Sequence, residues 1–88
     1  MNRNIEIQTF VIPIFFDYDR PHYSPEVLLK EDNAILGYLE LSSSDGTIFR
    51  KVSEQPLQRH EKRLFVSSQD AENAALQIAQ HFDYNSIK

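Results

Sequence analysis

SSQDAENAALQIAQHF, residues 67–82, is the stretch that decides the fold. Its apolar side chains recur at the i, i+3, i+4, i+7, i+8 and i+11 spacing of one helix face: Ala71, Ala74, Ala75, Ile78, Ala79 and Phe82. Most of these are alanines, whose small side chains let a helix backbone lie close to a sheet. The pattern predicts a C-terminal helix that packs through this face on a sheet formed by the preceding chain.

Three longer segments and one short segment before the helix have the composition of strands. They are residues 5–18, 34–42 and 47–52, followed by residues 63–66. In the first segment Glu6 and Gln8 alternate with apolar residues, and Phe10 to Phe16 is apolar on both faces. Pro13 has no N–H to give to a neighbouring strand, so we expect this strand at an edge of the sheet.

Two connections carry recognisable signals. Ser24-Pro25-Glu26 is typical of a helix start, because serine caps, proline suits the first helical position and glutamate suits the first turn. Val27, Leu28 and Leu29 would form the apolar side of this short helix. Asp45-Gly46 lies between two strand-like segments and indicates a tight hairpin turn with positive φ at Gly46.

The predicted fold is a single α+β domain over residues 1–88. An antiparallel sheet of three to four strands carries the C-terminal helix on one face, and a short helix follows the first strand. One helix covers one face, so the apolar residues left over need a second cover. The short helix is expected to supply part of it and a second copy of the chain the rest. The residues expected in this self-association contact are Phe10, Ile12, Ile14, Phe16 and Tyr38.

Composition narrows the classes of partner. The chain has no cysteine, which excludes disulfides and thiolate metal sites, and its formal net charge is −4. An acidic chain is a poor general binder of nucleic acid. The longest apolar run is interrupted by Pro13 and is too short to span a bilayer, and the first residues lack the pattern of a signal peptide. We therefore expect a cytoplasmic protein without membrane or nucleic-acid partners.

The sequence contains no catalytic signature. Its serines do not lie in a G-x-S-x-G elbow, and no residue is predicted to be catalytic. Asp17, Asp19 and His22 form only a loose set of potential metal ligands, and a polar loop explains them better. We predict no metal and no cofactor. If a ligand pocket exists between the sheet and the helices, its candidate residues are Tyr18, His22 and Tyr23.

A basic stretch from Arg50 to Arg63 interrupts the acidic chain and has aromatic residues nearby. The order of short helix, three strands and helix resembles the outline of a double-stranded-RNA-binding domain, and residues 67–75 are similar to the start of that family's last helix. The family places phosphate-binding lysines there. This chain has Gln69, Asp70 and Glu72 there instead, and the two carboxylates would repel phosphate, so the resemblance does not extend to RNA binding.

Two classes of function remain. The first is a non-enzymatic protein-binding or accessory module that associates with itself or with another protein. The alternative is a small-ligand-binding protein or minor enzyme. A concave apolar pocket with converging polar groups would favour the alternative, and a flat exposed patch would favour the module.

Overall fold

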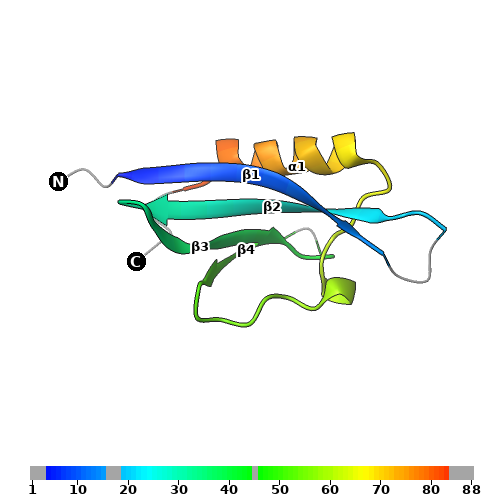
Figure 1. Ribbon diagram of the computed structural model, residues 1–88, viewed down its shortest axis with the longest axis horizontal. Coiled ribbons are helices and arrows are strands. Elements are labelled where there is room, and N and C mark those ends of the chain that lie inside the picture. The colour runs from blue at the N-terminus through cyan, green and yellow to red at the C-terminus, as the bar shows by residue number, and fades with distance from the viewer. Residues whose placement is uncertain (1–3, 16–18, 45, 84–88) are drawn as a thin grey trace.

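The computed structural model describes residues 4–15, 19–44 and 46–83, in which one helix packs on a four-stranded antiparallel sheet (Figure 1). The strands lie in chain order, and the elements are β1 (Ile5–Ile14), β2 (His22–Glu31), β3 (Ala34–Leu41), β4 (Thr47–Lys51), the 3-10 turn η1 (Arg59–Glu61) and α1 (Ser68–Gln80). This arrangement confirms the predicted α+β class and the predicted edge position of the first strand.

Helix α1 forms the layer that the alanine spacing predicts. The Ser67 hydroxyl caps its first turn by accepting a hydrogen bond from the Asp70 N–H at 3.3 Å. Ala71 and Ala75 are completely buried, and Ala75 and Ile78 join Val27, Leu29 and Leu39 in the core. The helix packs mainly against β1 and β2, so it leaves the β3–β4 half of this face more open.

The short helix predicted after the first strand is wrong, because residues 22–31 form β2 in the middle of the sheet. A two-turn helix is marginal by itself, whereas this segment bonds to strands on both sides. Pro25 is tolerated there. Tyr23 donates its N–H to Phe65, which lies on the side of β2 away from β1. Backbone nitrogens two residues apart in a strand face the same side, so the nitrogen of Pro25 also faces away from β1. The β1–β2 ladder therefore loses no donor at Pro25.

The tightest turn lies between β2 and β3, at a place where the sequence analysis predicts none. Asp32 and Asn33 have φ values of 52° and 68°, as a two-residue hairpin turn with positive φ at both positions requires. The predicted β3–β4 hairpin exists, but positive φ at Gly46 is wrong. The Ser42 side chain closes that loop instead: its hydroxyl accepts from the Gly46 N–H at 3.2 Å. Asp45 lies outside the described residues.

A register shift changes which residues of β3 face the core. Leu29 pairs with Gly37 but Lys30 pairs with Ile35, so Leu36 is an extra residue on β3. Leu36 packs against the core, although strict alternation along residues 34–42 would place it on the other face, together with Tyr38. Ile35 is 46% exposed as a result.

Residues 52–62 cross the second face of the sheet, and residues 63–66 lead from there back to α1. The prediction of a strand at residues 63–66 is wrong. Among the described residues this part of the chain forms only single bridges, between Tyr23 and Phe65 and between Ser42 and Lys62. The preceding segment, which contains Leu57 and η1, lies against the side of β2 and β3 opposite α1. It supplies part of the second cover that the sequence analysis assigns to a short helix.

Candidate functional site

Strand β1 is a long edge with little charge. It has ten residues, and its only ionisable side chain is that of Glu6. Strand β2 bonds to it on one side, and the other side carries no partner among the described residues. An edge of this length and composition is a template for pairing with another strand.

The bonding pattern of β2 shows which β1 residues face the open edge. Tyr23 exchanges both backbone hydrogen bonds with Phe65, at 2.7 and 2.8 Å, so its pair with Pro13 is not hydrogen-bonded. Bonded and non-bonded pairs alternate along an antiparallel ladder. The residues that direct their N–H and C=O groups outward are therefore Ile5, Ile7, Thr9, Val11 and Pro13, of which only Pro13 lacks a donor.

Apolar side chains accompany this edge. On the face opposite α1, Phe10 is 40% and Ile12 is 41% exposed, and Phe15 just beyond β1 is 67% exposed. Ile14 is only 6% exposed. Of the other residues predicted for self-association, Tyr38 is half-buried on β3 and Phe16 lies outside the described residues.

Helix α1 also contributes to this edge. Glu72 and Ala75 line a small groove together with Thr9, Phe10 and Val11, so Glu72 lies on the β1 side of the helix. Leu76, one turn after Glu72 on the same side, is 43% exposed. Exposed apolar side chains thus flank β1 on both faces of the sheet.

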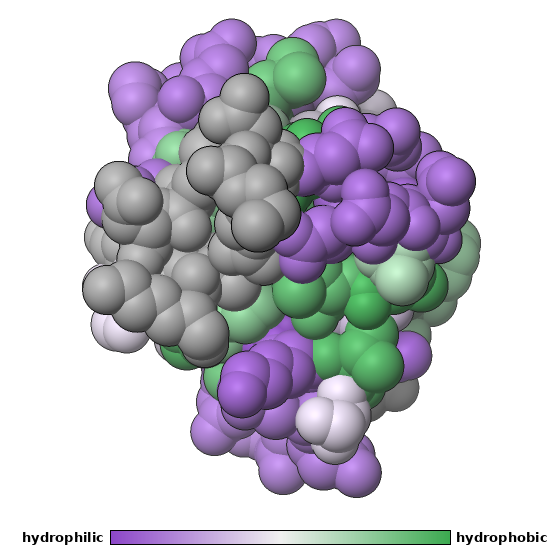
Figure 2. All heavy atoms as spheres, turned by 90° about the vertical axis from the view of Figure 1, so that its left-hand side faces the viewer, coloured by the Kyte–Doolittle hydropathy of each residue, from purple (hydrophilic) through white to green (hydrophobic). Residues whose placement is uncertain are grey.

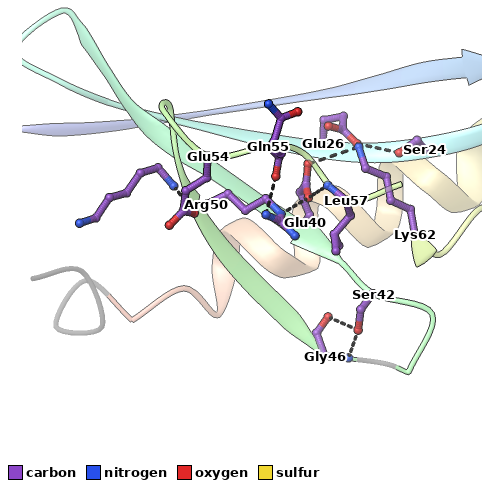
Figure 3. A network of polar contacts seen from close by, with 11 residues as sticks. Ser24, Glu26, Glu40, Ser42, Gly46, Arg50, Glu54, Gln55, Leu57 and Lys62 are labelled. Carbon is purple, nitrogen blue, oxygen red and sulfur yellow. Dashed lines mark hydrogen bonds and ion pairs between the residues drawn. The ribbon is translucent and has the colours of Figure 1, made fainter. Parts of the chain in front are cut away.

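A network of charged side chains crosses the second face of the sheet (Figure 3). The Lys62 ammonium lies 3.6 Å from Glu26 Oε2 and 3.3 Å from Glu40 Oε1, and thereby joins neighbouring strands. Arg50 Nε donates to Glu40 Oε2 at 3.0 Å, and Ser24 donates its hydroxyl proton to Glu26 Oε2 at 2.6 Å. The side chains of the two glutamates are 8% and 4% exposed, so the carboxylates at the centre of the network are buried.

The same network fastens residues 52–62 to the sheet. The Leu57 N–H donates to Glu40 Oε2 at 3.3 Å, and Arg50 donates to the Gln55 carbonyl (Figure 3). Burial raises the pKa of Glu26 above its usual 4.5. The Ser24 hydrogen bond and the Lys62 charge oppose this rise, and the Glu40 charge adds to it.

We expect Glu26→Gln to change how stability depends on pH. An acid whose pKa is raised by folding binds more protons in the folded state, so stability falls as pH rises from about 4.5 through the folded pKa. Glutamine cannot ionise, so this fall should disappear and the variant should be the more stable protein at neutral pH. Urea unfolding between pH 4 and pH 8 measures the effect, with the exposed Glu72→Gln as control. Parallel curves for Glu26→Gln and the wild type would show that burial of Glu26 does not govern its ionisation.

A pocket of about 420 Å³ adjoins the network. Its apolar lining comes from the end of β1, with Ile12, Ile14 and Phe15, and from Leu57. Three polar side chains, those of Ser24, Arg59 and Lys62, also line it. Apolar walls with a few polar groups are typical of small-molecule sites.

A second, larger groove of about 700 Å³ lies between α1 and the β3–β4 half of the sheet. Its apolar surface includes Leu39, Leu41, Phe49, Ile78 and Phe82. Figure 2 shows hydrophobic surface between hydrophilic regions at one end of the molecule. The groove follows from a helix that covers two strands of a four-stranded sheet.

The residues predicted for a ligand pocket lie apart from both of these hollows as far as the structure describes them. His22 and Tyr23 are half-buried on β2 and line neither the 420 Å³ pocket nor the 700 Å³ groove, and Tyr18 lies outside the described residues. Within residues 4–15, 19–44 and 46–83, no group of three His, Asp or Glu side chains is placed to hold a metal ion. The basic stretch is divided: Arg50 and Lys62 bind buried glutamates, and Arg63 lies over the Phe65 ring at 5.2 Å.

No local signal in the sequence marks Glu26, Glu40 and Lys62 as a cluster. They are 14 and 22 residues apart along the chain. Glu26 also matches the first turn of a helix. Only strand pairing brings them together, so no local spacing could reveal them.

Comparison of the chain with protein-family models, curated proteins and solved structures found no match. In the described part of the chain, no helix has the length and apolar character needed to cross a membrane.

Proposed function

We propose that this chain is a non-enzymatic protein-contact module that associates with a second copy through β1. The observation that carries the proposal is the contrast between the two edges of the sheet. Strand β4 has five residues and carries Arg50 and Lys51, whereas β1 has ten residues and one charge. Short, basic edges discourage strand pairing and long apolar edges favour it.

An antiparallel pairing centred on Thr9 uses the whole edge. Thr9 lies in the middle of the five residues whose backbone groups face outward. A twofold axis there places Ile7 opposite Val11 of the second copy and Glu6 opposite Ile12. The two copies of Glu6 therefore do not face each other, and like charges do not oppose the pairing.

The position of α1 is compatible with this pairing. The helix packs on β1 and β2, and neighbouring strands are about 4.8 Å apart. If the helix axis lies midway between β1 and β2, it is about 4.8 Å from the twofold axis of the dimer. The two copies of α1 would then be about 10 Å apart, close to the usual 8–10 Å of packed helices.

The same arrangement buries the apolar side chains along the edge. Leu76 would face the other helix on one side of the joined sheet. On the other side, Phe10 would lie diagonally across from Phe10 of the second copy, within reach of an aromatic contact. A stable dimer of this kind should bury at least about 1,000 Å² in total.

The substitution Thr9→Pro tests the pairing. It removes an outward-facing N–H without removing a donor from the β1–β2 ladder, so the fold should survive. Sedimentation equilibrium should show a species of twice the 10.3 kDa chain mass for the wild type and a single chain for Thr9→Pro. Thr9→Val keeps the N–H and the side-chain shape, and it should remain dimeric.

A second variant separates edge pairing from other modes of association. Phe10→Lys places a charge on the edge without changing the backbone, and it should weaken the dimer at least about tenfold. Circular dichroism would confirm that each variant is folded. A wild type that sediments as a monomer at millimolar concentration would refute the proposal, as would a dimer that persists in both variants.

A further inference from the structure

We propose that the 420 Å³ pocket between the end of β1 and residues 56–62 binds a small monocarboxylate with an apolar body. The pocket does not require the proposed dimer, because one copy of the chain supplies every described side chain that lines it. The site combines a largely buried ammonium, an exposed guanidinium and hydrocarbon side chains.

The polar end of the pocket favours an anion. Lys62 is 13% exposed and fixed by Glu26 and Glu40, but an ammonium has three N–H donors and a third remains for a ligand. Arg59 lines the same pocket from the exposed side, and none of the ion pairs among the described residues includes it. A guanidinium binds a carboxylate through two parallel hydrogen bonds.

The charge balance favours a single negative charge over a phosphate. Lys62 already shares its charge with two carboxylates, and Arg59 is the one cation in the pocket that no described acid neutralises. Ser24 donates its proton to Glu26 at 2.6 Å, so its hydroxyl offers no further donor. Two donor groups match the two oxygens of a carboxylate.

The walls favour a hydrocarbon body. Ile12 and Phe15 are 41% and 67% exposed, and Leu57 lines the same pocket. Exposed side chains of this size along a pocket gain most from an apolar ligand, because binding removes their surface from water. The volume lies in the usual range for small-molecule pockets.

A nuclear magnetic resonance titration of the full chain with octanoate tests the proposal, with octanol as the uncharged control. Octanoate should shift the backbone amides of Phe15, Leu57 and Lys62 saturably, and octanol should bind at least about tenfold more weakly. Arg59→Gln should lower the affinity for octanoate about tenfold, whereas the exposed Lys51→Gln should not change it. Glu26→Gln should raise the affinity, since it removes one carboxylate that competes for Lys62.

Three results would overturn the proposal. They are equal binding of octanol and octanoate, an affinity that Arg59→Gln leaves unchanged, and shifts confined to the groove residues Ala74 and Gln77. Repeating the titration with Thr9→Pro keeps the two proposals distinguishable. The ligand should bind that variant whether or not the wild type forms a dimer.

Discussion

Replacing Ala75 with glutamate should unfold the protein. Ala75 is completely buried on the face of α1 that meets Val27, Leu29 and Leu39. A glutamate there would overfill a packed core and place a carboxylate among apolar side chains. The combined cost should exceed about 4 kcal/mol, which is most of the stability of a small domain.

Far-UV circular dichroism with thermal melting measures this effect. Ala75→Glu should lose the cooperative transition or melt tens of degrees below the wild type. Asn73→Glu is the matched control, because it adds the same side chain two residues away on the exposed face of α1. A cooperative transition near the wild-type temperature in Ala75→Glu would mean that α1 is not part of the core.

Helix α1 could be predicted because its information is local. The alanine spacing defines the buried face, and Ser67 marks the beginning. The strands at residues 5–14, 34–41 and 47–51 could be predicted for the same reason, since each shows its own apolar alternation. These three strands and α1 make up most of the sheet and the helical layer that covers it.

Strand β2 could not be predicted from its own residues. Ser24-Pro25-Glu26 satisfies the rules for a helix start, yet the ladder bonds to β1 and β3 outweigh that local preference. The competing signal was the pair Asp32-Asn33, since both residue types tolerate positive φ and can close a hairpin. A hairpin turn at these two residues implies that the segment before them, residues 22–31, is a strand.

The candidate sites depend on β2, the segment that the sequence pattern predicts as a helix. Once residues 22–31 pair with β1, Glu26 and Ser24 face the second side of the sheet beside Glu40. Lys62 then completes the network from a loop whose path no sequence pattern specifies. The edge position of β1 could be predicted from Pro13. The pocket beside the network could not, because its position depends on the register of three strands.

Placing valine at Gly37 should destabilise the protein by at least about 3 kcal/mol, because β3 and β4 leave no space for a side chain there. A Cβ atom on Gly37 would overlap the backbone oxygen of Arg50 and would lie 2.8 Å from the ring of Phe49. The first neighbour is backbone, so the β3–β4 ladder would have to separate. Phe49 packs against the core, so its displacement would disturb the core as well.

Gly46→Ala is the control for Gly37→Val. Gly46 does not have positive φ, and a Cβ there would meet only the Ser42 hydroxyl at 3.3 Å, so the cost should stay below about 1 kcal/mol. Urea unfolding of both variants gives the comparison. Because Arg50 binds Glu40, separation of β4 should also loosen the buried network, and the amides of Leu57 and Lys62 should exchange faster with solvent in Gly37→Val. Unchanged stability in Gly37→Val would contradict the close contact between β3 and β4, and with it the position of Arg50 in the network.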